Sequence, residues 1–314
     1  MRALVTGVAG FIGSTLADHL ISEGWSVIGA DRFTAYYEEA QKRGNISSAM
    51  CHDAFTLVEA DLLTADLRHL LDGVDVVFHL AAQPGVRLSW ADGFQLYNEL
   101  NVNLTQRLLE ACRGRSLHRF VYASSSSVYG QALQWPTTEQ APTRPFNPYG
   151  VTKLAAELLC NTYAANFQVP TVSLRYFTVY GPRQRPDMAI HRMIQAARHQ
   201  VAFPLYGDGS HIRDFTFVGD VVDATARAAT AEVEPGAVLN VAGGSDTTVS
   251  DLLQLVSEAV GSPVPVQVRP PQPGDVHRTG GSIAMAAEQL DWRPITGLED
   301  GVRAQVAWHL SALG

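Results

Sequence analysis

Short apolar runs rich in valine alternate with longer helical patterns along the first half of the chain. Runs of this length, apolar throughout and separated by helices, are typical of buried parallel strands. We expect the intervening helices to include residues 12–23, 97–112 and 149–167. Such strand–helix repeats predict an α/β fold with a Rossmann-type doubly wound parallel sheet, in which ligands bind beyond the carboxyl ends of the strands. The predicted strands are residues 3–5, 27–30, 56–59, 74–80, 119–124 and 171–175.

A glycine-rich turn, Gly7-Val8-Ala9-Gly10-Phe11-Ile12-Gly13, follows the first strand at once and leads directly into a helix. Glycines there allow a tight turn and a close backbone approach to a pyrophosphate, which the helix N-terminus then faces. Asp31 ends the second strand, where a carboxylate can accept both ribose hydroxyls and repels a 2′-phosphate. The pattern predicts dinucleotide binding with NAD favoured over NADP, although Arg32 could meet such a phosphate if it is not simply a solvated charge. Asp61 and Leu62 end the third strand, where Asp61 either contacts adenine or caps the next helix.

The pattern changes after about Tyr176, because ten of the chain's 16 prolines lie beyond that point and break the sequence into short elements. We expect an NAD-binding domain at residues 1–175, which also receives residues 217–240. Residues 176–314 then form a smaller C-terminal α/β substrate-binding region.

Composition narrows the class of protein. A chain of 314 residues with 46% hydrophobic content can bury a large core. The formal net charge of −8 argues against a nucleic-acid or anionic-membrane partner. The sequence contains no run of about 18 apolar residues, the length that would predict a membrane span. Three scattered cysteines indicate neither a disulfide framework nor a zinc site and favour a reducing cytoplasm. We therefore expect a cytoplasmic protein with no metal site and a small-molecule ligand.

Tyr149 and Lys153 are four residues apart on a predicted helix, so they share one face. An ammonium in that position can stabilise a phenolate and lower the tyrosine pKa from about 10 toward neutrality, which makes the tyrosine a general base. On an exposed helix such a pair is usually structural. The glycine-rich turn and the serines at residues 124–127 favour a site that transfers a hydride.

Several motifs together resemble the extended short-chain dehydrogenase/reductase family of nucleotide-sugar enzymes, of the NAD-dependent epimerase/dehydratase type. They are Gly7-x-x-Gly10-x-x-Gly13, His79-Leu80-Ala81-Ala82, Asn101, Val128-Tyr129-Gly130 and Tyr149-x-x-x-Lys153. The resemblance implies that Ser125, Tyr149 and Lys153 form the catalytic set. The cofactor-binding residues expected from the turn, the strand ends and this resemblance are Gly7, Gly10, Phe11, Ile12, Gly13, Asp31, Arg32, Asp61, Leu62, Leu80, Ala81, Ala82, Asn101, Tyr149, Lys153 and Tyr176.

The residues after Ser125 separate the branches of this family. Its dehydratases need an acidic pair there, and its UDP-glucuronate decarboxylases tend to carry a glutamate in the same segment. This chain has Ser126 and Ser127 instead, and no glutamate before Tyr129. The comparison leaves an epimerase or a simple reductase.

Residues 174–188, Leu-Arg-Tyr-Phe-Thr-Val-Tyr-Gly-Pro-Arg-Gln-Arg-Pro-Asp-Met, closely resemble UDP-glucuronate 4-epimerases, as do Gly85-Val86-Arg87 and Tyr36-Tyr37. The resemblance implies that UDP-glucuronic acid and UDP-galacturonic acid are interconverted at C4, through a transient 4-keto sugar and reversible hydride transfer to bound NAD. Hydroxyls of Ser126, Ser127 and Thr178 could donate hydrogen bonds to the C6 carboxylate, with Arg185 adding complementary charge. Alternatively, the arginines at 183 and 185 only decorate a loop.

Downstream motifs resemble the family's uridine diphosphate site. Tyr206-Gly207-Asp208-Gly209 precedes Arg213, whose planar guanidinium suits two phosphate oxygens, and Asp275 follows in a loop that holds ribose in the family. Arg192 and Arg278 are further anion-binding candidates, unless each forms a surface ion pair. The substrate-binding residues expected are Arg87, Ser126, Ser127, Thr178, Arg185, Arg192, Tyr206, Arg213, Asp275 and Arg278.

Other functions stay open from the sequence. A UDP-glucose/UDP-galactose 4-epimerase would be indifferent to a C6 carboxylate, and a decarboxylase would release a pentose. A non-catalytic NAD-binding regulator is a third alternative, but such proteins commonly lose the tyrosine or the lysine. The resemblance also implies a homodimer built on the helices near residues 97–112 and 149–167.

Overall fold

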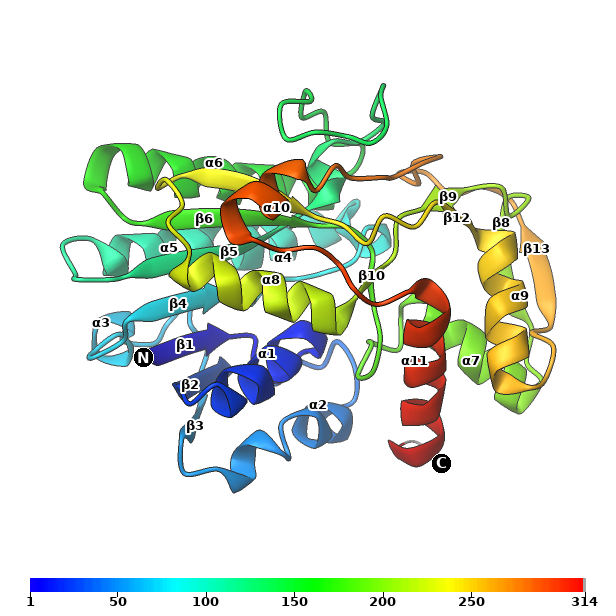
Figure 1. The fold of residues 1–314 in the computed structure, drawn as a ribbon, viewed down its shortest axis with the longest axis horizontal. Coiled ribbons are helices and arrows are strands. Elements are labelled where there is room, and N and C mark those ends of the chain that lie inside the picture. The colour runs from blue at the N-terminus through cyan, green and yellow to red at the C-terminus, as the bar shows by residue number, and fades with distance from the viewer. Residues whose placement is uncertain (313–314) are drawn as a thin grey trace.

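The computed structural model describes residues 1–312 and contains one sheet of seven parallel strands. Their order across the sheet is β11-β6-β5-β4-β1-β2-β3, which confirms the doubly wound fold (Figure 1). All six predicted strands are present, and β11 is an additional one that pairs with β6. The strands are β1 Arg2–Thr6, β2 Ser26–Asp31, β3 Phe55–Glu59, β4 Val76–His79, β5 Arg119–Ser125, β6 Thr171–Tyr176 and β11 Ala237–Val241.

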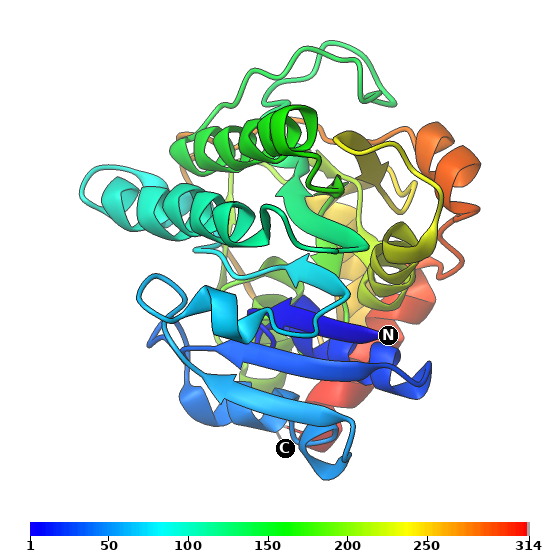
Figure 2. The same cartoon turned by 90° about the vertical axis from the view of Figure 1, so that its left-hand side faces the viewer.

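Helices cover both faces of this sheet (Figure 2). On one face, α1 and α8 pack side by side, and on the other α3, α5 and α6 cover the strands. These five helices are α1 Phe11–Ser22, α3 Leu67–Leu70, α5 Leu104–Cys112, α6 Pro148–Phe167 and α8 Val218–Thr230. Smaller elements on this part of the chain are α2 Glu39–Asn45, α4 Gly93–Tyr97 and the 3₁₀ turns at Ala49–Cys51, Arg87–Ser89 and Ser126–Val128.

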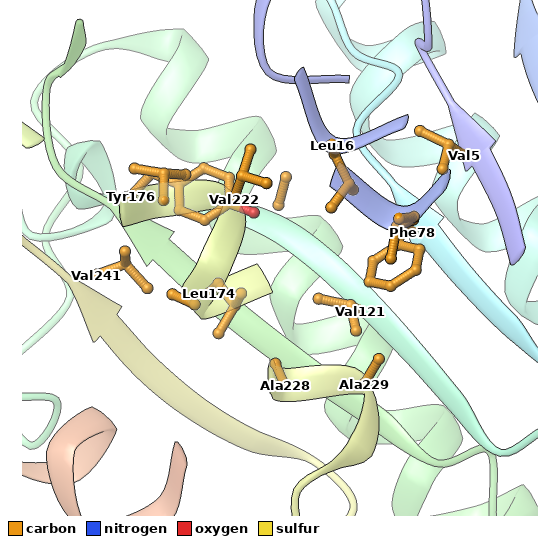
Figure 3. Close-up of a cluster of buried hydrophobic side chains, with 14 of the residues drawn as sticks. Val5, Leu16, Phe78, Val121, Leu174, Tyr176, Val222, Ala228, Ala229 and Val241 are labelled. Atoms are coloured by element: carbon orange, nitrogen blue, oxygen red, sulfur yellow. The ribbon is translucent and has the colours of Figure 1, made fainter. Parts of the chain in front are cut away.

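The core between α1, α8 and the sheet consists of fully buried aliphatic and aromatic side chains (Figure 3). Leu16 of α1 faces Phe78 of β4, while Val222 of α8 lies near Tyr176 at the end of β6. Burying a side chain such as Leu or Phe stabilises the fold by about 1.5–3 kcal/mol. This packing therefore holds the carboxyl ends of β1, β4, β5 and β6 rigidly in register.

Helix α6 is defined at both ends by local sequence. The side chain of Asn147 accepts a hydrogen bond from Gly150 N at 2.9 Å, and Pro148 occupies the first turn, as is common at helix N-termini. Gln168 ends the helix in a left-handed conformation with φ of 57°. The helix thus begins where it presents Tyr149 and Lys153 to the end of β5.

The predicted helix at residues 97–112 is not uniform. It consists of the end of α4, a π-helical segment Asn98–Asn103 and then α5. Inside the wide turns, Asn101 Oδ1 accepts a hydrogen bond from Gln83 N at 2.7 Å, and Asn101 Nδ2 donates to Thr152 Oγ1 at 3.0 Å. Since π-turns frequently occur at functional sites, this departure from the regular helix has a positional consequence: it brings α5, the loop after β4 and α6 together.

The C-terminal region has a core of its own between three helices, α7 Ala189–His199, α9 Val249–Val260 and α11 Leu298–Ala312. Helix α10 Ala284–Leu290 instead packs on β11 and α8. Short two-stranded pairs connect these elements: β7 Val179–Tyr180 with β10 Thr216–Phe217, β9 Ile212–Arg213 with β12 Thr247–Thr248, and β8 Phe203–Tyr206 with β13 Val266–Arg269. No helix within residues 1–312 is both long and apolar enough to cross a bilayer.

Candidate active site

The glycine-rich turn lies between β1 and α1 and is too tightly packed for side chains. Gly7 has φ of 70°, and its N–H donates to Ala30 O at 2.8 Å. A Cβ at Gly13 would lie 2.3 Å from Gly7 O, so only glycine lets α1 approach the turn this closely. The resulting cradle of backbone at a helix N-terminus fits the pyrophosphate of a dinucleotide.

The end of β2 supplies the charged rim of this cradle. Asp31 accepts hydrogen bonds from Ala9 N at 3.1 Å and from Phe33 N at 2.8 Å, which fastens its carboxylate over the turn. Arg32 forms an ion pair with Asp61 at 2.8 Å. Asp61 also accepts a hydrogen bond from Leu63 N at 2.9 Å, as in an Asx turn. Arg32 is therefore partnered by a carboxylate. Asp61 does not cap the next helix, because α3 is capped by Asp66, which accepts from Arg68 N at 3.0 Å and from His69 N at 3.2 Å. Contact of Asp61 with adenine, the other expected function, stays a prediction.

A cavity runs along the carboxyl ends of the strands, from the turn to α6. It is lined by every predicted cofactor residue except Asn101, whose side chain instead holds the backbone of Gln83 from beneath. Sequence reasoning missed Lys42, which reaches the cavity from α2 and donates to Thr34 Oγ1 at 3.0 Å. It also missed Gln83 and Ser124, which line the same cavity. Each directly follows or precedes a predicted site residue, Ala82 or Ser125, so adjacency in the sequence could have identified them.

The three predicted catalytic residues meet at one end of this cavity. Lys153 and Tyr149 line it from α6, and Ser125 lies at the end of β5, close enough to Tyr149 to affect its pKa. Burial lowers the pKa of Lys153 to about 8, and its ammonium donates to Ala123 O at 2.8 Å. Burial raises the pKa of Tyr149, opposed by the hydroxyl of Ser125 and the charge of Arg185.

The expected lowering of the Tyr149 pKa by Lys153 is therefore not found. The physical reason is twofold: Tyr149 is buried, which disfavours the phenolate, and the Lys153 ammonium is directed at a carbonyl of β5. The four-residue spacing established that Tyr149 and Lys153 share a helix face, but it did not establish which group the Lys153 ammonium contacts.

A second cavity lies in the C-terminal region and meets the first, since Tyr36 and Arg185 line both. Arg87 lies over the Tyr206 ring, 4.1 Å from its centroid, and 3.7 Å from the Asp275 carboxylate. Arg213 is half-buried and donates to Ile212 O at 2.9 Å. Of the predicted substrate residues, this cavity brings together Arg87, Thr178, Arg185, Arg192, Tyr206, Arg213 and Asp275.

Four arginines against two aspartates give this second cavity a positive lining, which suits a ligand with phosphate groups. At its junction with the first cavity, Arg185 forms a bidentate ion pair with Asp187 at 3.0 and 3.1 Å. Tyr36 OH donates to the same aspartate at 3.3 Å. Burial, assisted by Asp187, raises the pKa of Tyr36 to about 12, so its hydroxyl stays protonated as a donor.

Three predicted substrate residues do not line either cavity. Ser126 and Ser127 form a 3₁₀ turn after β5, in which Ser127 N donates to Ser125 Oγ at 3.1 Å. Arg278 faces a separate hollow, where it pairs with Asp246 at 2.6 Å and lies over the Trp135 ring. Arg278 thus adopts the ion-pair alternative. Residues 1–312 contain no group of three or more His, Cys, Asp or Glu side chains that could hold a metal ion.

Comparisons with known proteins agree with this geometry. The family model described as "NAD dependent epimerase/dehydratase family" matches residues 3–242. An uncharacterised UDP-glucose epimerase of Bacillus subtilis (strain 168) is 42% identical over 314 residues, covering 100% of this chain and 99% of the relative. A UDP-glucose 4-epimerase of Mycolicibacterium smegmatis is 38% identical, with 98% of this chain and 97% of the relative covered. The crystal structure of UDP-glucuronic acid 4-epimerase from Bacillus cereus, in complex with UDP-glucuronic acid and NAD, is 40% identical, with a TM-score of 0.95 and 98% of each chain covered.

Proposed function

Since the chain belongs to the NAD-dependent epimerase/dehydratase family and is an NAD-dependent nucleotide-sugar 4-epimerase, we propose that it interconverts UDP-glucuronic acid and UDP-galacturonic acid. The observation that carries the proposal is the position of Arg185. Its guanidinium lines both the cavity that contains Tyr149 and the arginine-rich cavity. A sugar whose diphosphate occupies the second cavity and whose C4 faces Tyr149 would have its C6 group within the field of this positive charge.

The proposed chemistry follows from the groups at the end of α6. NAD is the cofactor, and when bound it accepts a hydride from C4 of the sugar and returns it. Tyr149 removes the proton of the 4-hydroxyl and later gives it back, acting first as base and then as acid. Ser125, whose hydroxyl lies close enough to Tyr149 to lower its pKa, is placed to bind the same sugar oxygen. Inversion requires the 4-keto sugar to turn over between the two transfers, so the cofactor is not consumed.

The second cavity is suited to hold the nucleotide while the sugar turns. Arg213 and Arg87 can bind the two phosphates, and Asp275 beside Arg87 can accept a ribose hydroxyl. A ligand fixed at its nucleotide end remains free to rotate about the diphosphate. We propose that a fixed nucleotide and a mobile sugar together permit the hydride to return to the opposite face of C4.

One observation favours a second candidate, UDP-glucose/UDP-galactose 4-epimerisation. Because Asp187 pairs with Arg185 through both oxygens, the guanidinium already has a carboxylate partner, and a C6 carboxylate must compete with it. A neutral sugar needs no such exchange. The two relatives named as UDP-glucose epimerases make this alternative the relevant comparison.

Proton NMR of the NAD-loaded protein with UDP-glucuronic acid, and in parallel with UDP-glucose, tests the proposal. We expect UDP-galacturonic acid from the first substrate, at a rate well above turnover of the second. Preference for UDP-glucose would establish the second candidate, and a UDP-pentose product would indicate a decarboxylase. An absence of turnover with both substrates would favour a binding protein that regulates through NAD.

We further propose that residues 1–175 with residues 217–240 form the NAD-binding domain, and that the remainder of residues 176–314 binds the nucleotide sugar. The pairing of β11 with β6 and the packing of α8 on α1 support this division. So does the separate core of α7, α9 and α11 beneath the second cavity.

A homodimer through α5 and α6 is also proposed. Three large apolar side chains of α6, Val151, Leu158 and Phe167, are exposed although they lie on a helix that packs against the sheet. Covering them with a second copy would remove this apolar surface from water. Sedimentation of the native protein and of Leu158→Arg tests this: we expect a dimer that the charge converts to monomer, and a native monomer would contradict the proposal.

A reducing cytoplasm is the proposed location. Cys51, Cys112 and Cys160 are free thiols, two of them buried, which agrees with a protein that makes no disulfides.

A further inference from the structure

Three consecutive residues in the segment after β7 point in three different directions. Arg183 reaches α1, where its guanidinium pairs with Asp18 at 2.7 Å. Gln184 is buried against α11, and Arg185 reaches the junction of the two cavities. Arg183 has φ of 68°, in the left-handed region that residues other than glycine rarely adopt. The backbone therefore turns sharply just before Arg185, and something must hold it there.

The side chain of Gln184 is held by hydrogen bonds on both ends of its amide. Its Oε1 accepts from Gln305 Nε2 at 2.7 Å and from His191 N at 2.9 Å. Its Nε2 donates to Val179 O at 3.2 Å. The side chain is 1% exposed, so each of these groups would be costly to leave without a partner.

Gln305 reaches this segment from α11, more than a hundred residues later in the chain. It is fully buried, and while its Nε2 donates to Gln184, its Oε1 accepts from Gly181 N at 2.9 Å. One amide thus fastens both the first residue of the segment and the residue directly before Arg185. No residue of α11 lines either cavity, so Gln305 does not touch a ligand there, and its hydrogen bonds connect it to the site through this segment.

The two amides lie at the edge of an apolar core that includes Ile194, Val302 and Val306. Buried amide networks in which every group is partnered specify one arrangement of the backbone, which apolar contacts do not. The amide pair therefore specifies the direction of the chain at residue 184.

We infer that Gln305, acting through Gln184, is a positioning residue that directs Arg185 toward the C6 group of the bound sugar. With Gln184 held toward α11, the next side chain is turned to the junction of the cavities. This inference rests on the proposed function, in which Arg185 distinguishes a C6 carboxylate from a hydroxymethyl group. Without the tether, Arg185 would lose its fixed direction while the nucleotide end of the site stays intact.

The test is the variant Gln305→Leu in the NAD-loaded protein, with Tyr149→Phe as the background so that bound sugars are not turned over. Calorimetry would give dissociation constants for UDP-glucuronic acid, UDP-glucose and UDP. We expect the preference for the acid over UDP-glucose to fall about tenfold, within the range for coupled neighbours. Affinity for UDP should change less than about twofold, because its binding groups lie elsewhere. An unchanged preference would overturn the inference.

A matched control and a double variant separate positioning from general loosening of α11. Val306→Ala removes a buried side chain from the next position of the same helix, and it should leave the preference unchanged. Combining Gln305→Leu with Arg185→Gln should cost no more selectivity than Arg185→Gln alone, since both act on one interaction. Additive losses, or an equal effect of Val306→Ala, would contradict the inference.

A crystal structure of Gln305→Leu distinguishes failure of the inference from failure of the proposed function. If the parent protein binds both sugars equally, the proposed selectivity fails, yet the structure still shows where Arg185 points. Displacement of Arg185 from the cavity junction would support the positioning effect of Gln305. An Arg185 in its present place, paired with Asp187, would overturn it.

Discussion

At the scale of single residues, burial controls the acid–base groups. It raises the pKa of Tyr149 and lowers that of Lys153 to about 8, so near pH 7 the tyrosine is protonated and the lysine mostly charged. Additional positive charge near Tyr149, such as that of the nicotinamide ring of NAD, would favour its phenolate.

Replacing Tyr149 by phenylalanine removes the proton-transfer group and leaves the ring in place. We expect the epimerisation rate to fall at least about 100-fold, since positioned acid–base groups contribute factors of that size or more. NAD affinity should change little. Tyr163→Phe is the matched control on the same helix, because its hydroxyl contacts Gln106 and Glu110 on α5 instead. A nearly active Tyr149→Phe would exclude Tyr149 as the base.

Gly13→Ala tests the cradle at the start of α1. The added Cβ would lie 2.3 Å from Gly7 O, so the turn must shift. We expect loss of NAD affinity by titration, and a stability decrease of about 1–3 kcal/mol, typical of overpacking. Gly44→Ala is the control because its Cβ would meet nothing within 4 Å, and it should leave NAD affinity unchanged. Equal NAD affinity in both variants would contradict this account of the turn.

At the scale of elements, a buried ion pair joins α6 to the strands beneath the catalytic residues. Glu157 of α6 pairs with Arg175 of β6 at 2.6 Å and accepts from Ser124 Oγ of β5 at 2.6 Å. Arg175 also donates to Tyr129 OH at 2.8 Å. This network lies one helical turn beyond Lys153, so it sets the distance between α6 and the end of β5.

Glu157→Gln should destabilise the protein by about 3–5 kcal/mol, because it leaves the Arg175 charge buried and unpaired. Urea unfolding measures this change. Asp223→Asn is the comparison: it breaks the exposed pair with Arg227 on α8, which is expected to contribute about 0–1 kcal/mol. Similar losses in the two variants would show that the buried network adds no special constraint.

At the scale of the whole molecule, two buried histidines link stability to pH. His79 lies between Thr6 and Thr105 beneath the cofactor cavity, and His309 lies between α7 and α11. Burial lowers the pKa of each to about 3, with Lys153 adding to the effect at His79 and His191 at His309. Since their ordinary pKa is about 6.5, the unfolded chain binds more protons between those values. Their contribution to stability is therefore complete above about pH 6.5 and is lost as the pH falls toward 3.

His309→Gln should reduce the slope of unfolding free energy against pH by up to about 1.4 kcal/mol per pH unit between pH 4 and 6, since one such group is removed. Unfolding in urea at several pH values gives the slope. The control His69→Gln changes an exposed histidine and should leave the slope as in the parent protein. A slope that does not respond to His309→Gln would mean that this side chain is not buried in its neutral form.

The sequence by itself determined the strands, the glycine-rich turn and the shared helix face of Tyr149 and Lys153, because each depends on residues close together in the chain. Residues 76–78 are apolar and predict a buried strand, and a helix repeat places Tyr149 near Lys153 whatever surrounds them. Family resemblance then placed distant residues such as Arg213 and Asp275 in one site, and the second cavity contains both.

Only the tertiary structure decided what those side chains contact. It directed Lys153 to Ala123 O, paired Arg278 with Asp246 away from the site, and brought Gln305 of α11 to Gln184. The physical reason is that a hydrogen bond between residues far apart in sequence depends on how helices and strands pack. No local pattern records that packing, whereas periodicity and turn chemistry are local.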